Sequence, residues 1–377
     1  MKKIIAGFCT VVLLLLSGCS LFQSNHFNAY DKQVIKAKTG YNYALYLEKN
    51  GTLYSPGSID DAGDYILFLD ETNGIVAENV RDFGTMSWGG YYIDNQNDLY
   101  IFNHQRINLY QYKPSDRFKK ILNDIKCAYV TNDDLYYQDM NGDLFFAGII
   151  DGREYSLDEH TKVGENVSCQ DYDYWIENDN TLHTFSNRIT DTELVAAANE
   201  NMKALPDVTK MKVSNECILL LADKELWYIG DIDYLKQNGF ELQDRENKNI
   251  VSVKLADDIV DFDANAQTIA AVKSDGTAFG WGKLLMNGDT EQQKPIIEYH
   301  DDAVPLNISD VESVHVGGDE HITFVTKEHH TKVFTSNDFG FCGNSTENEF
   351  IGVKSTPKTW VNPDQSKQPS SSSTQQV

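Results

Sequence analysis

The sequence predicts an all-β protein, a seven-bladed β-propeller behind an N-terminal lipoprotein signal peptide. Three observations support this fold class. A short pattern recurs seven times along the 377 residues, a β-hairpin signal follows each copy, and 41% hydrophobic residues supply material for a core. A blade of four short strands cannot bury both of its faces alone, whereas closing seven blades into a ring covers them all.

The repeat consists of Asn, Asp or Gln, then Val or Ile, then usually an apolar residue three positions later. The seven Val/Ile residues, called the anchors below, are Val34, Val80, Ile125, Val167, Val208, Ile259 and Val311. They are separated by 41 to 52 residues, a period typical of propeller blades. We interpret the polar residue before each anchor as a side chain that caps the turn into a strand.

Two strand-like runs separated by a turn follow each anchor. Three of these turns contain Asn-Gly or Asp-Gly, at 50–51, 141–142 and 275–276, and favour a type I′ turn with positive φ at two residues. The other four hairpins have weaker turn sequences, at 95–98, 178–180, 223–225 and 329–330. The longer connection to the next anchor leaves room for a fourth strand.

The propeller is expected to span residues 34–361. Its last strand-like run, 358–361, is expected beside its first, 34–38, so that the ring closes without free edges. The segment Thr190–Ala204 has good helix formers with Pro206 beyond its end, which predicts a short surface helix. Residues 231–249 are polar and predict a loop. Long loops often carry function, so both segments are candidate interaction sites.

Two stretches resemble RCC1-type repeats, which also occur in the streptomycete β-lactamase inhibitor II propeller. They are residues 259–282 (IVDFDANAQTIAAVKSDGTAFGWG) and 311–343 (VESVHVGGDEHITFVTKEHHTKVFTSNDFGFCG). The matching features are Gly317-Gly318…His321, Asp275-Gly276, Trp281-Gly282, Asn337…Gly340…Gly343 and Pro357. The resemblance implies a ring of seven blades in which His321 packs. It implies no particular function.

The N-terminus is an export signal. Two lysines precede an apolar run from Ile4 to Leu16, which is too short to span a bilayer. The ending Leu16-Ser17-Gly18-Cys19 resembles the lipobox of bacterial lipoproteins. That resemblance implies cleavage after residue 18, a diacylglycerol thioether on Cys19 and an acyl group, such as palmitate, on its amine. Residues 19–33 then form a lipidated tether that anchors the protein to the cell membrane or the outer membrane.

The opposite end of the chain, residues 362–377, finishes in the polar run SKQPSSSSTQQV. This segment is predicted to be a disordered tail because it has almost no apolar residue to bury.

The charge excludes two classes of partner. The formal charge is −25, and removing residues 1–18 takes away two lysines and no acid, which leaves −27. Such a protein repels nucleic-acid phosphates and anionic lipid headgroups. We therefore expect no nucleic-acid partner and membrane attachment only through the lipid on Cys19.

Acidic clusters offer the only hint of catalysis. They occur at Asp60-Asp61…Asp64, at Asp171…Asp173 and at Asp257-Asp258…Asp261…Asp263, and paired carboxylates at a suitable separation can hydrolyse glycosides. With 57 acidic residues in the chain, solvated strand ends and loops are the simpler explanation of such clusters. The nine histidines have no metal-ligand spacing. We expect no catalytic residue, no metal and no cofactor.

Four cysteines remain beyond the lipid site, namely Cys127, Cys169, Cys217 and Cys342. Cys127 and Cys169 both lie two residues after the anchors of adjacent blades and are the candidate disulfide. Two interpretations stay open, because outside the cytoplasm such cysteines form disulfides, whereas buried cysteines also act as small hydrophobic residues. The aromatic pairs Tyr91-Tyr92, Tyr136-Tyr137 and Tyr174-Trp175 are expected to pack on alternate faces of their strands.

The sequence thus favours a monomeric, non-enzymatic binding or scaffold propeller, held outside the cytoplasm by its lipid. Its partner would be a protein or an envelope glycan. The alternative is an extracytoplasmic hydrolase or lyase acting on a polysaccharide or the cell wall, with carboxylates at the mouth of the propeller channel.

Overall fold

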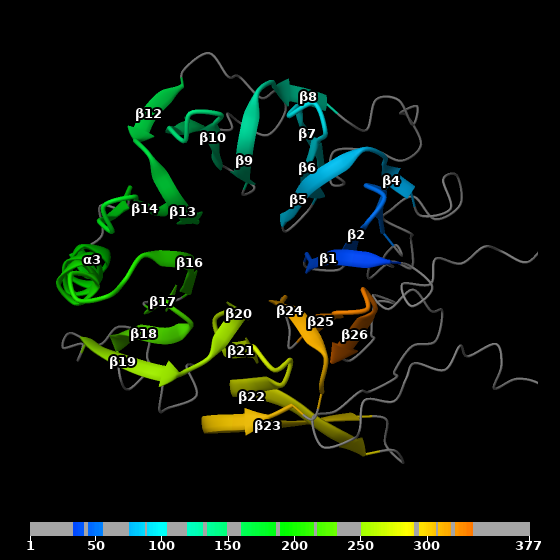
Figure 1. Ribbon diagram of the computed structural model, residues 1–377, viewed down its shortest axis with the longest axis vertical. Helices are drawn as coiled ribbons and strands as arrows, with labels where there is room; N and C mark the ends of the chain where they lie inside the picture. Colours follow the sequence, from blue (N-terminus) through cyan, green and yellow to red (C-terminus); the bar gives the residue numbers. More distant parts are fainter. Residues whose placement is uncertain are drawn as a thin grey trace, which may run out of the picture.

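The computed structural model shows seven antiparallel sheets arranged in a ring around a central axis (Figure 1). It describes residues 33–40, 44–55, 75–86, 89–103, 119–130, 134–148, 160–185, 189–214, 217–231, 250–289, 294–306, 308–317 and 321–334. Each sheet is formed by strands consecutive in the sequence and paired in sequence order. The predicted seven-bladed β-propeller is confirmed.

Each blade runs from an inner strand outward, and the bounds of its strands follow. Blade one contains β1 (Val34–Thr39), β2 (Ala44–Glu48), β3 (Leu53–Tyr54) and β4 (Ile75–Ala77). Blade two contains β5 (Val80–Met86), β6 (Gly89–Asp94), β7 (Leu99–Asn103) and β8 (Lys119–Leu122). Blade three contains β9 (Ile125–Val130), β10 (Asp134–Asp139), β11 (Leu144–Gly148) and β12 (Thr161–Gly164). Blade four contains β13 (Val167–Asp171), β14 (Tyr174–Glu177) and β15 (Leu182–Thr184).

The remaining three blades follow the same order around the ring. Blade five contains β16 (Val208–Ser214), β17 (Cys217–Ala222), β18 (Glu225–Asp231) and β19 (Ile250–Ala256). Blade six contains β20 (Ile259–Ala264), β21 (Thr268–Lys273), β22 (Ala278–Asp289) and β23 (Lys294–Pro305). The described strands of blade seven are β24 (Val311–Val316), β25 (Ile322–Thr326) and β26 (Thr331–Phe334). All seven anchors are the first residues of the inner strands, as the repeat predicts.

A repeated backbone hydrogen bond joins neighbouring blades. In six blades the anchor N–H donates to a carbonyl in the hairpin turn of the preceding blade, at 2.8–3.0 Å. The pairs are Val80 to Gly51, Ile125 to Asn97, Val167 to Gly142, Ile259 to Lys224, Val311 to Gly276 and Val34 to His329. The last pair joins blade seven to blade one and closes the ring. In blade five the anchor Val208 donates instead to the side-chain oxygen of Asn180, at 3.1 Å.

The hairpin geometry differs from the expected type I′ turns. At 48–51 the Gly51 N–H donates to the Glu48 carbonyl and positive φ occurs at Gly51 but not at Asn50, and the other Asn-Gly and Asp-Gly hairpins repeat this. These loops are therefore type I turns followed by a left-handed glycine. Two successive residues of positive φ occur instead at Asp223 and Lys224, one of the turns with a weak sequence signal.

The polar residue before the anchor acts through its backbone as well. Asn79, Asp124, Asn166, Asp258 and Asp310 all adopt positive φ, between 51° and 64°. Asn and Asp tolerate this left-handed region better than other residues with a side chain. The preference for Asn or Asp at this position therefore has a conformational cause, and the side-chain cap that we inferred from the sequence stays a prediction.

The core is divided into seven apolar clusters, one between each pair of neighbouring blades. The adjacent aromatic residues alternate between clusters, as expected. Tyr91 packs between blades two and three, whereas Tyr92 packs between blades one and two. Tyr136 and Tyr137 divide in the same way, as do Tyr174 and Trp175. The small cluster between blades seven and one includes Val34, Tyr46 and Val325.

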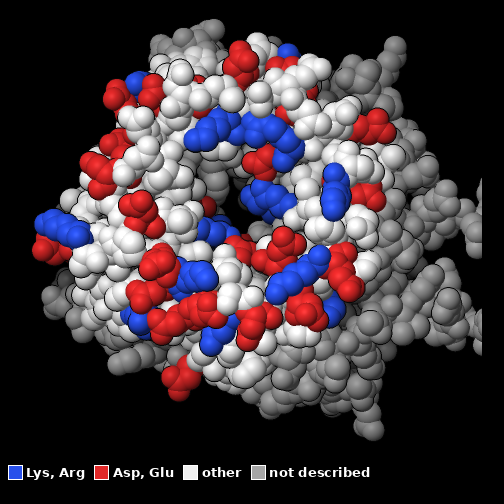
Figure 2. Space-filling model, in the orientation of Figure 1, with Lys and Arg blue, Asp and Glu red and all other residues white. Residues whose placement is uncertain are grey.

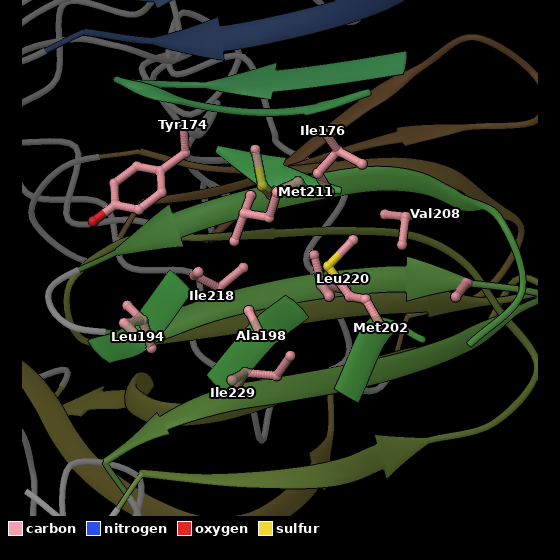
Figure 3. Packing of buried hydrophobic residues seen from close by; sticks show 12 residues of the cluster. Tyr174, Ile176, Leu194, Ala198, Met202, Val208, Met211, Ile218, Leu220 and Ile229 are labelled. Atoms are coloured by element: carbon pink, nitrogen blue, oxygen red, sulfur yellow. The ribbon is translucent and has the colours of Figure 1, made fainter. Parts of the chain in front are cut away.

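A helix, α3 (Ile189–Met202), lies outside blade four at the place that other blades give to a fourth strand (Figure 1). Its bounds agree closely with the predicted Thr190–Ala204. Leu194, Ala198 and Met202 recur every four residues and are buried between blades four and five (Figure 3). The Asn199 side chain exchanges two hydrogen bonds with the backbone of Leu182 on β15, at 2.7 and 2.9 Å. These bonds satisfy part of the β15 edge as a paired strand would.

The two expectations for the chain beyond these elements remain untested. The run 358–361, expected to close the ring beside the first strand, and the predicted loop after Asp231 both lie outside the described residues.

Candidate functional site: the central channel

The channel is lined by the seven inner strands, β1, β5, β9, β13, β16, β20 and β24 (Figure 1). Each of them shows a register irregularity next to its anchor. In a β-bulge two residues oppose one, so the anchor and the residue three positions later share a face. Val80 and Phe83, for example, both pack against blade one.

The residues two and four positions after each anchor take the opposite face and meet their counterparts around the axis. We call them the first and the second ring. The first ring is Lys36, Asp82, Cys127, Cys169, Lys210, Asp261 and Ser313. The second ring is Lys38, Gly84, Tyr129, Asp171, Lys212, Asp263 and His315.

Ion pairs connect ring residues from neighbouring blades. In the first ring Lys36 pairs with Asp82, and Lys210 pairs with Asp261 at 2.7 Å. In the second ring Lys212 lies between two carboxylates, 3.5 Å from Asp171 and 3.6 Å from Asp263.

The Asp263 carboxylate also contacts blade seven. Its Oδ2 atom lies 2.6 Å from Nδ1 of His315 and accepts a hydrogen bond from the Val316 N–H at 3.0 Å. Its Oδ1 accepts one from Ala264 at 2.9 Å. Asp261 likewise accepts the Val314 N–H at 2.8 Å, and blade-four Asp171 accepts the Val213 N–H of blade five at 2.7 Å. Each of these three carboxylates therefore connects its own inner strand to the inner strand of the next blade.

Burial and pairing set the protonation of these groups. Burial alone would raise the pKa of Asp263, but Lys212 and His315 lower it far below its ordinary value. At Asp171 burial prevails over Lys212, and the pKa is raised. Burial likewise lowers the pKa of His315, against the attraction of Asp263.

Lys38 differs from the other channel lysines. Burial, with repulsion from Lys36, lowers its pKa from 10.5 to about 7, although Asp82 opposes the shift. Among the residues that the structure describes, its amine has neither an ion-pair nor a hydrogen-bond partner.

The face shown in Figure 2 is hollowed at the axis, with Lys and Arg side chains gathered along the upper margin of the hollow. Acidic side chains predominate below it. Arg81, next to its anchor on blade two, donates to the carbonyls of Ile125 and Lys126 on blade three, the latter at 2.8 Å. This overall acidic protein therefore presents positive charge close to its channel.

The two candidate disulfide residues lie in the first ring on adjacent blades, as their sequence positions predict. Both are free thiols in the structure, and Cys127 donates to Oε1 of Gln138 at 3.3 Å. Burial raises the pKa of both thiols, that of Cys169 to about 12, so neither is an activated thiolate. Their pairing stays a prediction. Cys217 is buried between blades five and six, and Cys342 lies outside the described residues.

The other residues singled out in the sequence have varied positions. Cys19 and the Asp60–Asp64 cluster lie outside the described residues. His321 is buried, with burial lowering its pKa to about 3, as expected of a packing residue. Within the described ranges no three His, Cys, Asp or Glu side chains could hold a metal ion, and no helix there is long and apolar enough for a membrane span.

The sequence patterns did not identify the lysines of the channel as candidate functional residues. Their signal was the fixed distance of two or four residues from an anchor, which becomes visible only when the repeats are aligned on the bulge.

Comparisons with known proteins were made by sequence and by structure. No protein-family model matches the chain, and no curated protein sequence matches it. Prp20p from Saccharomyces cerevisiae is 14% identical with a TM-score of 0.50, covering 76% of this chain and 77% of that one. Yeast RCC1 (Prp20) bound to Kap60 is 14% identical with a TM-score of 0.43, over 86% and 76% of the two chains. Hsv2 from Kluyveromyces lactis is 8% identical with a TM-score of 0.44, over 80% and 96%.

At such identities a structural likeness shows the fold and nothing further. The likeness to Prp20p, together with the seven sheets, makes this chain an RCC1-like seven-bladed β-propeller.

Proposed function

We propose that this chain is a monomeric, non-enzymatic binding or scaffold propeller, held by a lipid on Cys19 at the outer side of a bacterial membrane. Its partner would be a protein or an envelope glycan. The observation that carries the proposal is the role of the channel carboxylates. Asp171, Asp261 and Asp263 each bind a cation and a backbone N–H of the next blade. Carboxylates that are bound in this way stabilise a rigid propeller.

The alternative hydrolase or lyase requires two carboxylates that face a substrate, one of them protonated as an acid. The described channel carboxylates are instead occupied by lysines and by the neighbouring backbone. In addition, the pKa of Asp263 is lowered, which is opposite to what a general acid needs. The pKa of Asp171 is raised by burial, but its carboxylate is bound by Lys212 and by the Val213 N–H. This geometry favours binding over hydrolysis.

Two further observations support the proposal. The lipobox-like sequence ending at Cys19 supports the anchor, since a protein of charge −25 needs a lipid to stay at an anionic surface. The structure of Prp20p is described together with its binding to Gsp1p and histones, so this fold can present a protein-binding surface.

The test uses the full chain in bacterial cells fed an alkyne fatty acid. Wild type is expected to carry the label and to sediment with membranes, whereas Cys19→Ala is expected to lose the label and the sedimentation. Cys9→Ala, within the signal, is the matched control and should behave as wild type. Equal labelling of wild type and Cys19→Ala would disprove the anchor.

Binding is tested separately, by cross-linking on intact cells followed by identification of partners. A discrete partner that Cys19→Ala no longer captures supports a scaffold at the membrane. Turnover of purified cell-wall polymer that Asp261→Asn abolishes would establish the hydrolase instead.

A further inference from the structure

The two lysines of the second ring have different neighbours. Lys212 of blade five lies between Asp171 and Asp263, and both carboxylates bind it. Lys38 of blade one occupies the same ring position, but its neighbours in the ring are Gly84 and His315, neither of which has a carboxylate. One lysine is therefore neutralised by the protein itself, whereas the other is not.

His315 provides a second nitrogen atom with free hydrogen-bonding capacity. Its Nδ1 atom is held by Asp263 at 2.6 Å, which fixes the orientation of the ring. Its Nε2 atom is buried and has no hydrogen-bond partner among the residues that the structure describes. With Nδ1–H donating to Asp263, Nε2 of neutral His315 is an acceptor. A buried polar atom without a partner is costly, so a ligand that supplies a donor at this position, such as the O–H of hydrogen phosphate, gains that energy on binding.

The two residues come from strands that pack together where the ring closes. Residues of β1 and β24 are in contact, and the backbone bond from Val34 to His329 joins the same two blades. Lys38 and His315 have the same register position, four residues after their anchors. We propose that Lys38 and His315 form a channel site at the closing seam for the anionic group of a ligand, a carboxylate or a phosphate, which binds together with a proton.

The charged surroundings determine how this site responds to pH. Lys36 on its own strand and Lys212 on β16 disfavour charge on Lys38, whereas Asp82 on β5 and Asp263 on β20 favour it. The neighbouring β2 carries Tyr46 and Glu48, β25 has no titratable residue, and β24 carries Glu312 and His315.

Because burial brings the pKa of Lys38 to about 7, an anion bound at the site must favour the ammonium form. Binding at about pH 8 should then take up close to one proton.

The test is isothermal titration of the full chain with inorganic phosphate and, separately, with acetate. Each titration is done in two buffers of different ionisation enthalpy, which reports proton uptake. Millimolar dissociation constants are expected for at least one of the two anions, on the order of 1 mM. They should weaken toward tenfold per pH unit above about pH 7, because the ammonium form is lost. A preference for phosphate or for acetate identifies the ligand class.

Three variants locate the site. Lys38→Met keeps the length of the side chain and removes its charge, and should weaken binding at least about tenfold, the loss expected for a charge-assisted contact. Lys210→Met, which removes a channel lysine already bound by Asp261, and the exposed Lys203→Met should change the dissociation constant less than about threefold. Melting curves confirm that each variant is folded.

Three results would overturn the proposal. They are equal affinities of wild type and Lys38→Met, an equal loss in Lys38→Met and Lys210→Met, and no binding of either anion up to about 20 mM.

Discussion

Replacing Asp263 with Asn should severely destabilise the propeller, because this carboxylate connects three inner strands. It lies on β20, contacts Lys212 of β16 at 3.6 Å and His315 of β24 at 2.6 Å, and accepts the Val316 N–H at 3.0 Å. Its side chain is 8% exposed, so water cannot replace these partners. An amide of the same shape keeps the packing and removes the charge.

The magnitude follows from leaving Lys212 with a single carboxylate in a buried position. Breaking a buried ion pair from one side costs about 3–5 kcal/mol, and we take the lower value of about 3 kcal/mol because Asp171 still binds Lys212. At roughly 2 °C per kcal/mol for a large domain, the melting temperature should fall by about 6 °C. Since the folded pKa of Asp263 lies below the unfolded one, this stabilisation is present above about pH 4 and is lost as the pH falls further.

The assay is thermal and urea unfolding at about pH 7, followed by circular dichroism, with Asp257→Asn as the matched control. Asp257 pairs with Lys254 at 2.7 Å but is 68% exposed, so its loss should cost at most about 1 kcal/mol. If Asp263→Asn is no less stable than Asp257→Asn, the channel carboxylates do not hold neighbouring blades together, and the stabilising role given to Asp263 is refuted.

Three further changes probe other parts of the ring. Buried His321, with a pKa near 3, stays neutral in the folded state, so stability should fall as the pH drops below about 6.5, by about 2 kcal/mol at pH 5; His321→Gln should remove that slope in urea titrations. Gly282→Ala puts a Cβ 2.0 Å from a backbone oxygen at φ +79° and should cost more than about 2 kcal/mol, whereas Gly142→Ala, with no atom nearer than 3.8 Å, should cost about 1 kcal/mol. Asn199→Ala removes both bonds between α3 and blade four and should cost about 1–3 kcal/mol in thermal melts.

Each of these has a contradicting outcome. An unchanged pH slope in His321→Gln would show that another group titrates, and equal losses at Gly282 and Gly142 would show that steric contact is unimportant. For the helix, Glu200→Gln on the exposed side is the control, and equal stability of the two variants would show that the Asn199 bonds do not hold α3.

Much of the fold could be predicted because a propeller repeats local signals. Each signal can be recognised within a few residues. These signals are the Val or Ile anchors, the turns after them and the helix formers near Leu194. The detail of the turns was less accessible, because Asn50-Gly51 is compatible with more than one turn type. The inner strand also has a bulge next to its anchor, as between Val34 and Lys36. That bulge has no sequence signal of its own.

The site was harder to predict than the fold. Cys127 and Cys169 could be placed on adjacent blades by counting from their anchors, and the acidic stretch around Asp261 and Asp263 was visible as a cluster. Its role was not visible, because the partners Lys210 and Lys212 lie about fifty residues earlier in the chain.

The sequence by itself determined the number of blades, their boundaries and the order of their strands, because these depend on contacts between residues that are close along the chain. Only the tertiary structure decided which charges in the channel are neutralised. Seven distant strands bring one residue each to the same ring, and the identity of its neighbours there leaves Lys212 paired and Lys38 without a carboxylate. That difference depends on burial and on distances of a few ångströms across the axis, which no local pattern of residues contains.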